Sequence, residues 1–124
     1  MLLKDTLMKK RIMLLEDDKK TLEITEEILL EEGYHPIACD HYESVGSILE
    51  ILPELILLDV RLSGGYGHLL CAQLKDNPAT SAIPVILVSA ADNLATIAFD
   101  CHADNYLAKP YSMENLIDMV RYYD

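Results

Sequence analysis

The stretch PELILLDVRLSGGYG, residues 53–67, decides the interpretation of this chain. Four apolar residues, 55–58, lead directly into Asp59, and a glycine-rich segment follows. A short, wholly apolar run is typical of a strand that is buried on both faces. A carboxylate at the end of such a strand destabilises the fold unless it is solvated, paired or bound to a cation. We therefore predict that Asp59 has specific partners.

Outward from this stretch, short apolar segments alternate with amphipathic helical ones. Strands are expected at residues 11–15, 34–38, 55–59, 83–89 and 105–108. Helices are expected over residues 21–29, 43–51 and 67–76, with Gly33 beyond the end of the first, and after the capping side chains of Asp92 and Ser112. The alternation predicts an α/β fold with a five-stranded parallel sheet, doubly wound with (βα)5 connectivity.

The size and composition of the chain limit the classes of function. With 124 residues we expect one domain, and a formal net charge of -11 argues against direct binding of nucleic acid or an anionic membrane. A membrane span needs about 20 apolar residues, and no apolar run of the chain approaches that length. The opening MLLKDTLMKK lacks the features of a signal peptide. Three scattered cysteines, Cys39, Cys71 and Cys101, fit a reducing compartment. We expect a cytoplasmic protein whose cysteines are small buried hydrophobes.

Residues 1–10 are expected to be an N-terminal extension and residues 11–124 the folded domain. Whether the extension is native, begins at Met8 instead, or forms a short helix stays open.

Polar side chains follow four of the five predicted strands. They are Glu16, Asp17 and Asp18 after the first strand, Asp59 after the third, Ser89 after the fourth and Lys109 after the fifth. The carboxyl ends of parallel strands meet at one edge of a sheet, so we expect these groups to lie together. Clustered carboxylates favour Mg²⁺, here through Asp17 and Asp59, and a carboxylate can attack phosphorus to give an aspartyl phosphate. Asp59 is therefore a candidate phosphoryl acceptor, with Lys109 and Ser89 contacting the phosphoryl oxygens.

The segments RIMLLEDD, PELILLDVRLSGGYG, IPVILVSA and NYLAKPY, in this order, resemble the receiver domain of two-component response regulators over residues ~10–124. The resemblance implies a flavodoxin-like fold with strand order 2-1-3-4-5 and a cis peptide between Lys109 and Pro110. It also implies roles for individual residues: Glu16 and Asp17 as the acidic pair, Asp59 as the phosphorylated residue, the backbone carbonyl of Arg61 as a Mg²⁺ ligand, Lys109 as the phosphoryl contact, Ser89 as the hydroxyl switch and Tyr106 as the aromatic switch.

The function implied by the resemblance is phosphorelay signalling. A sensor histidine kinase or histidine phosphotransfer protein is the expected donor, and Mg²⁺ the expected cofactor. The domain is expected to assist only its own phosphorylation and dephosphorylation. Phosphorylation is expected to change the surface made by the fourth helix, the fifth strand and the fifth helix, where an unknown output partner or a second copy docks. A monomer or a phosphorylation-dependent homodimer is expected.

One segment departs from the family pattern. Receivers most often have Pro and then Asp-Gly in the loop after the acceptor strand, whereas this chain has Ser63 and then Tyr66-Gly67. The glycines of this segment lead us to expect a flexible loop.

Each residue also has a simpler interpretation when it is taken alone. Asp59 could be a solvated strand end, Asp18 a helix cap, Ser89 a partner of the local backbone, Lys109 a surface charge and Tyr106 a packing residue. Two other functions compete. One is a Mg²⁺-dependent phosphohydrolase, although Arg61 stands where such enzymes need a second acid, and the other is a docking module that works without phosphorylation.

Overall fold

The computed structural model describes residues 10–124, and the expectations for residues 1–9 lie outside that range. The sheet strands are β1 (Arg11–Leu15), β2 (His35–Cys39), β3 (Leu55–Asp59), β6 (Val85–Ser89) and β7 (Asn105–Ala108). The helices are α2 (Lys19–Glu31), α3 (Val45–Ile51), α4 (Gly67–Asp76), α5 (Leu94–Asp100) and α6 (Met113–Tyr122). Two short strands, β4 (Arg61–Leu62) and β5 (Gly65–Tyr66), form a separate hairpin. Strands and helices alternate as predicted.

The five sheet strands are parallel and lie in the order β2-β1-β3-β6-β7. Counted along the chain this is 2-1-3-4-5, so the order implied by the resemblance is confirmed. The direction in which successive strands are added to the sheet reverses between β1 and β3. This is because β2 lies on one side of β1 and all later strands of the sheet lie on the other. The carboxyl ends of β1 and β3 are therefore neighbours at the switch point, where ligands bind in this class of sheet.

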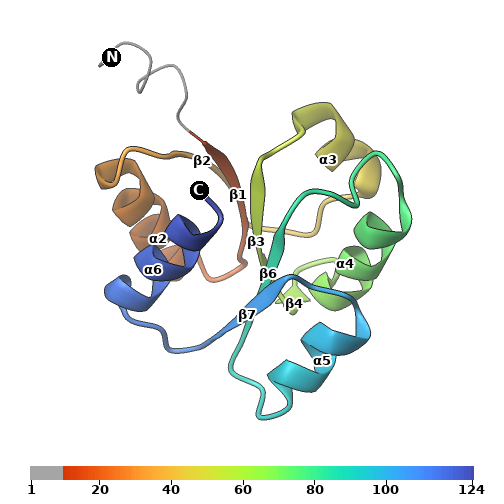
Figure 1. Cartoon of the computed structure of the whole chain (residues 1–124). Coiled ribbons are helices and arrows are strands. Elements are labelled where there is room, and N and C mark those ends of the chain that lie inside the picture. Colours follow the sequence, from red (N-terminus) through yellow and green to blue (C-terminus); the bar gives the residue numbers. More distant parts are fainter. Residues whose placement is uncertain (1–9) are drawn as a thin grey trace.

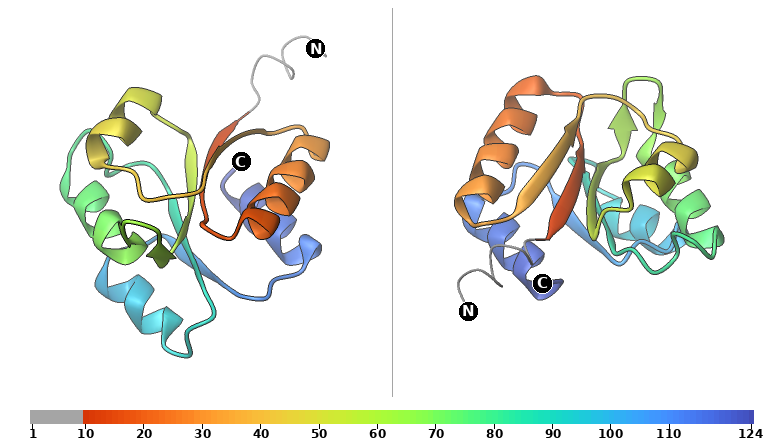
Figure 2. Two further views of the ribbon diagram at one scale, coloured as in Figure 1. Left: turned by 180° about the vertical axis from the view of Figure 1, so that it is seen from behind. Right: turned by 90° about the horizontal axis from the view of Figure 1, so that it is seen from above.

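Two layers of helices cover the sheet. Helices α2 and α6 lie on one face, and α3, α4 and α5 lie on the other (Figures 1 and 2). Successive residues of β1 and β3 enter the two cores alternately: Ile12, Leu14, Leu55 and Leu57 pack on the α2/α6 side, and Met13, Leu15, Ile56 and Leu58 on the other. This two-sided burial explains why the central strands are wholly apolar rather than alternating in polarity.

The helix ends agree with the sequence in most places. Asp18 caps α2 by accepting from the backbone N–H of Thr21, and Ser112 caps α6 by accepting from that of Asn115. Gly33 has a φ of 90°, a left-handed conformation that glycine adopts without a steric penalty. The prediction that Asp92 caps the fourth helix is wrong, because α5 begins one residue later than expected. Asn93 occupies the N-cap position of α5 and makes no side-chain cap bond.

Two apolar residues with the helical spacing of a buried face are exposed. Ile24 is 52% exposed and Met113 57%, whereas Leu22 and Leu116 are buried. In α2 the buried residues are Leu22, Thr25 and Leu29, so Thr25 and Leu29 agree with the helical spacing and Ile24 does not belong to the buried face. Periodicity alone finds the amphipathic helix but does not decide which residues at the border of its apolar face are covered.

The segment after β3 has a defined conformation, where a flexible loop was expected. It forms the antiparallel hairpin β4–β5, in which Arg61 pairs with Tyr66 and Leu62 with Gly65. The backbone N–H of Tyr42 donates to the carbonyl of Ser63 across 2.9 Å. The ring of Tyr42 lies so close to Gly65 that an added Cβ would come within 2.4 Å of it. The ring of a distant tyrosine thus holds the hairpin in place.

The remaining predictions on composition concern the cysteines and membrane spans. Cys71 and Cys101 are buried, as predicted, and Cys39 is partly exposed. Among the helices of residues 10–124, none combines the length and apolar character needed to span a bilayer.

Candidate functional site

The carboxyl ends of β1 and β3 bring three acids together, as the sequence predicts. Glu16 and Asp17 directly follow β1, and Asp59 is the last residue of β3. One carboxylate oxygen from each lies within 4.8 Å of the others. Glu16 and Asp59 are each only 7% exposed, and Asp17 is exposed. Two buried carboxylates and one at the surface therefore share a small volume.

Lys109 directly follows the edge strand β7, and its side chain reaches two of these acids. Its ammonium Nζ lies 2.6 Å from Glu16 Oε1 and 3.0 Å from Asp59 Oδ2. Its backbone N–H donates to the carbonyl of Ser89 across 2.9 Å, which joins the ends of β6 and β7. The Lys109–Pro110 peptide is cis, as the resemblance implies. The surface-charge interpretation of Lys109 is thereby excluded.

Carboxylates outnumber cationic side chains in the cluster formed by Glu16, Asp17, Asp59 and Lys109. Burial raises the pKa of Asp59 to about 7, the adjacent Glu16 acts in the same direction, and the hydrogen bond from Lys109 opposes the rise. Burial disfavours the charged form of Lys109, but its bonds to Glu16 and Asp59 outweigh this and raise its pKa. One lysine thus faces three carboxylates, and a further positive charge at this place would be favourable.

A cavity of about 370 Å³ opens above Asp59. Its lining combines acids, cations and small residues: Asp17, Asp59, Arg61, Ser89, Ala90, Ala91 and Lys109. The hydroxyl of Ser89 accepts from the backbone N–H of Ala91 across 3.0 Å, so its own proton is free to be donated elsewhere. The two alanines leave the mouth of the cavity uncrowded. The cavity therefore offers a nucleophile, a hydroxyl donor and two cationic side chains to one ligand.

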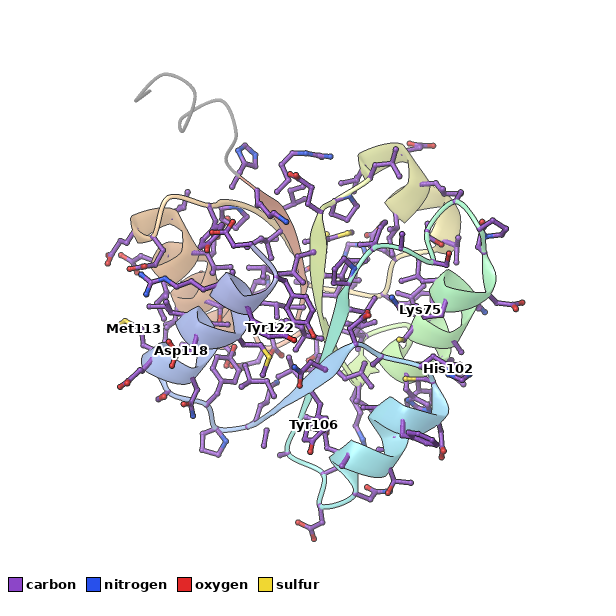
Figure 3. All side chains as sticks on the ribbon, in the orientation of Figure 1. Lys75, His102, Tyr106, Met113, Asp118 and Tyr122 are labelled. Atoms are coloured by element: carbon purple, nitrogen blue, oxygen red, sulfur yellow. The ribbon has the colours of Figure 1, made fainter. Side chains whose placement is uncertain are left out.

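Tyr106 is placed differently from the other predicted residues. Tyr106 lies on β7, and 44% of its surface is exposed (Figure 3). Among the described residues, those that line the cavity do not include it. The switch role of Tyr106 would require the segment between β6 and α5 to move. It stays a prediction.

A close backbone contact beside Asp59 was not anticipated from the sequence. The N–H of Gly67 donates to the carbonyl of Val60 across 2.7 Å, and a Cβ added to Gly67 would lie 1.9 Å from the carbonyl oxygen of Asp59. Any larger residue would displace the backbone that carries the acceptor carboxylate. The signal for this contact is a glycine at the first position of α4, which the sequence analysis takes as a sign of loop flexibility.

The donor set suits a hard divalent cation. The three carboxylates supply oxygen ligands only, which match Mg²⁺ or Ca²⁺ rather than zinc or copper. Glu16 also accepts from the backbone N–H of Asp18 across 3.2 Å, which restrains its orientation. Glu16, Asp17 and Asp59 are therefore the residues that could hold such an ion.

Known proteins share both the sequence pattern and the fold. A family model for the response regulator receiver domain matches residues 12–121. The phosphate regulon transcriptional regulatory protein PhoB of Escherichia coli K12 is 32% identical over 117 residues, which make up 92% of this chain and 51% of PhoB. Protein PilG of Pseudomonas aeruginosa is 34% identical over 109 residues, 85% of this chain and 81% of PilG. The chain thus spans about half the length of PhoB.

Solved structures agree. A putative response regulator from Chloroflexus aurantiacus has a TM-score of 0.83 at 26% identity, covering 93% of this chain and 97% of its own. Chemotaxis protein CheY4 of Vibrio cholerae has the same TM-score at 13% identity, covering 94% and 99%, and supports the fold alone. With the family model, the relatives and the strand order in agreement, the chain belongs to the response regulator receiver domain family of two-component phosphorelay signalling.

Proposed function

We propose that Asp59 accepts a phosphoryl group from the phosphohistidine of a sensor histidine kinase or a histidine phosphotransfer protein. A carboxylate oxygen of Asp59 forms a bond to phosphorus, the P–N bond to the donor imidazole breaks, and the imidazole nitrogen takes up a proton. The observation that carries the proposal is the ammonium of Lys109 lying 2.6 Å from Glu16 and 3.0 Å from Asp59 beneath an open cavity.

The residues of the site supply complementary interactions in this step. Lys109 places a positive charge beside the acceptor oxygen, where negative charge builds up on the transferred group. The free proton of Ser89 can be donated to a second phosphoryl oxygen. When bound by Glu16, Asp17, Asp59 and the backbone carbonyl of Arg61, Mg²⁺ would neutralise charge on a third oxygen. Glu16 keeps Lys109 in place while Asp59 is phosphorylated.

The signal is proposed to leave through the far edge of the sheet. A phosphoryl group on Asp59 draws the hydroxyl of Ser89 towards it, and the space vacated by the β6–α5 segment lets Tyr106 turn inward. Lys109 and Ser89 are joined through their backbones, so both strand ends respond together. The surface of α5, β7 and α6 then changes, and an output partner or a second copy of the chain docks there.

The remaining parts of the proposal concern setting and scope. Residues 11–124 form the receiver domain, residues 1–10 an N-terminal extension, and the chain acts in the cytoplasm, consistent with the unpaired thiols of Cys71 and Cys101. The domain assists its own phosphorylation and dephosphorylation and has no other substrate. It binds neither nucleic acid nor membrane directly, and is a monomer or a homodimer that forms on phosphorylation.

Intact mass spectrometry after incubation with acetyl phosphate tests the proposal. We expect an adduct of one phosphoryl group, ~80 Da, that is labile at alkaline pH and requires Mg²⁺. Asp59→Asn should not form it, whereas Asp118→Asn, which removes the same charge from the exposed face of α6, should. An adduct of the same size on Asp59→Asn, or no adduct on the native chain with any phosphodonor, would refute the proposal.

A further inference from the structure

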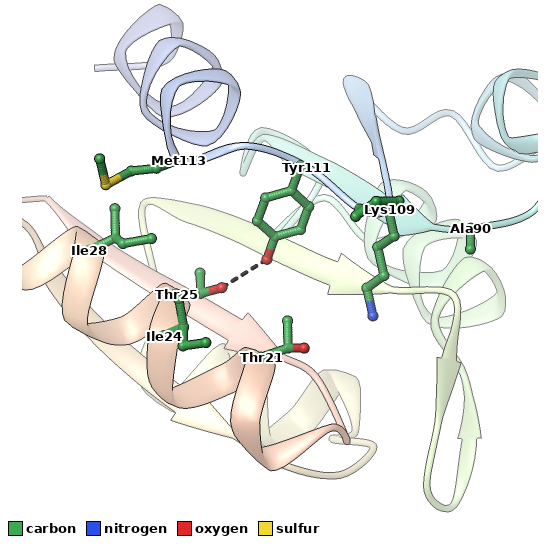
Figure 4. Close-up of a pocket in the computed structure, with 9 residues that line it drawn as sticks. Thr21, Ile24, Thr25, Ile28, Ala90, Lys109, Tyr111 and Met113 are labelled. Carbon is green, nitrogen blue, oxygen red and sulfur yellow. Dashed lines mark hydrogen bonds between the residues drawn. The ribbon is translucent and has the colours of Figure 1, made fainter.

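The buried hydroxyl of Thr25 meets the partly buried hydroxyl of Tyr111 beside the acidic cluster. Thr25 lies in the middle of α2 and is 5% exposed, and Tyr111 lies two residues after Lys109. Their hydroxyl oxygens are 2.8 Å apart, and Figure 4 shows the bond joining α2 to the segment that follows β7. The bond spans 86 positions of sequence, so neither residue alone indicates it.

This hydroxyl pair lies on the inner side of the acids. A cavity of about 20 Å³ is lined by Thr25 and Tyr111 together with Glu16 and Asp59. The alternation of β3 explains the arrangement: Asp59 points to the same face as Leu57, which is the face that α2 and α6 cover. The cavity of the phosphoryl site and the small cavity beside the hydroxyl pair therefore share Asp59.

The segment that carries Lys109 lies outside the regular secondary structure. Residues 109–112 belong to no helix or strand, and Pro110 has no N–H to donate. On the outer side a groove of about 640 Å³, lined by Ile24, Ile28 and Met113 among others, separates this segment from α2. Figure 4 shows the Tyr111 ring reaching across to Thr25, with the Lys109 side chain beside it. The hydroxyl bond is thus a specific tie across an otherwise open gap.

We infer that Thr25 and Tyr111 are positioning residues for the proposed phosphoryl transfer, acting by holding Lys109 over Glu16 and Asp59. The geometry forms a closed ring: Glu16 leads into α2, α2 is tied at Thr25 to Tyr111, and Tyr111 lies two residues after the lysine that binds Glu16. Without the tie, the chain between the Lys109–Ser89 backbone bond and the Ser112 cap of α6 loses the bond at Tyr111 that spans the groove. A displacement of the order of 1 Å at a reacting group lowers rates by up to about 100-fold.

The chemistry of Tyr111 agrees with this role. Burial raises the pKa of its hydroxyl, the bond to Thr25 opposes the rise, and the charge of Glu16 adds to it. The group is therefore neutral at physiological pH and remains a donor. Two hydroxyls carry two protons, and one suffices for the bond between them. The second can be donated into the small cavity, towards the carboxylates.

The test compares the rate of phosphorylation by acetyl phosphate at saturating Mg²⁺ in matched variants. We expect Tyr111→Phe and Thr25→Val each to lower the rate about threefold to tenfold, and the double variant to be no slower than the slower single one. Thr25→Ser keeps the hydroxyl and should stay within about twofold of the native rate. The matched control is Tyr34→Phe, because Tyr34 also lies in the α2/α6 core and donates to Asp124 at the opposite end of the sheet.

A second readout needs no phosphoryl transfer. The ¹⁵N-edited NMR signal of the Lys109 ammonium, assigned with Lys109→Arg, should move towards the signals of exposed lysines in Tyr111→Phe and Thr25→Val only. The inference fails if both variants keep the native rate and the native Lys109 signal, or if Tyr34→Phe changes them equally. The inference rests on the proposed function, but the two can fail separately. If the native chain does not accept a phosphoryl group, the proposed function is refuted. The NMR signal of Lys109 still decides whether Thr25 and Tyr111 position that side chain.

Discussion

Replacing Asp59 with asparagine removes a charge from a carboxyl group that is 7% exposed and crowded by Glu16. The pKa of Asp59 is raised from 3.8 to about 7, and one pKa unit corresponds to about 1.4 kcal/mol. In the folded state the proton is bound more tightly than in the unfolded chain. Binding of this proton therefore stabilises the folded state by up to about 4 kcal/mol. This stabilisation is fully present below pH 4 and is lost as the pH rises through about 7.

Asparagine has nearly the same shape and no proton to lose. Without divalent cations, we expect Asp59→Asn to be about 2–4 kcal/mol more stable than the native chain at pH 8, and the difference to shrink towards zero at pH 4. Mg²⁺ should then narrow the gap at pH 8, because it binds the native cluster more tightly. At 100 times its dissociation constant the ion would contribute about 2.7 kcal/mol.

Urea unfolding followed by circular dichroism measures these differences at pH 4, 6 and 8, with a chelator and then with Mg²⁺. Asp118→Asn serves as the control, since Asp118 is exposed on α6 and its replacement changes the net charge equally (Figure 3). The reasoning is refuted if Asp59→Asn is less stable than the native chain at pH 8 in chelator, or if its advantage is the same at pH 4 and pH 8.

Three further outcomes follow from single contacts. Gly67→Ala should destabilise the fold by at least about 2 kcal/mol in urea titrations, since its Cβ would lie 1.9 Å from a backbone oxygen, whereas Gly46→Ala, with its nearest atom at 3.7 Å, should be neutral or stabilising. Lys109→Met should cost about 2 kcal/mol at pH 8 in chelator, by leaving two buried carboxylates without their cation, and an unchanged urea midpoint would contradict this. Burial raises the pKa of Cys71, so Cys71 and Cys101 should react with a thiol reagent only in urea; rapid labelling of both under native conditions would show that they are accessible.

The sequence predicts the features that depend on local pattern and on the direction of strands. The wholly apolar runs before Glu16, Asp59 and Ser89 identify buried parallel strands, and parallel strands necessarily bring their carboxyl ends to one edge. The meeting of the acids with Lys109 follows from that rule without any knowledge of distances. The strand order itself came from the family resemblance and is not contained in the pattern.

The features that were missed depend on contacts between distant segments. In helix α2, Ile24 has the helical spacing of Thr25 and Leu29 and yet is exposed, because the packing partner decides which residues at the border of an apolar stripe are covered. The glycine-rich segment is a hairpin because Tyr42 packs on Gly65, and no local propensity reveals that contact. The Thr25–Tyr111 bond is hidden for the same reason, since a hydroxyl in an amphipathic stripe has no signature until its partner is known.

The claim that Asp59 carries an acyl phosphate is tested most directly by chemical trapping. Borohydride reduces an acyl phosphate on aspartate to homoserine, and peptide mass spectrometry then locates the altered residue. After treatment with acetyl phosphate and Mg²⁺, the account predicts homoserine at position 59 and at no other acid of the site. Unmodified Asp59 in a chain that has gained a phosphoryl group, or homoserine at Glu16 or Asp17 instead, would contradict it.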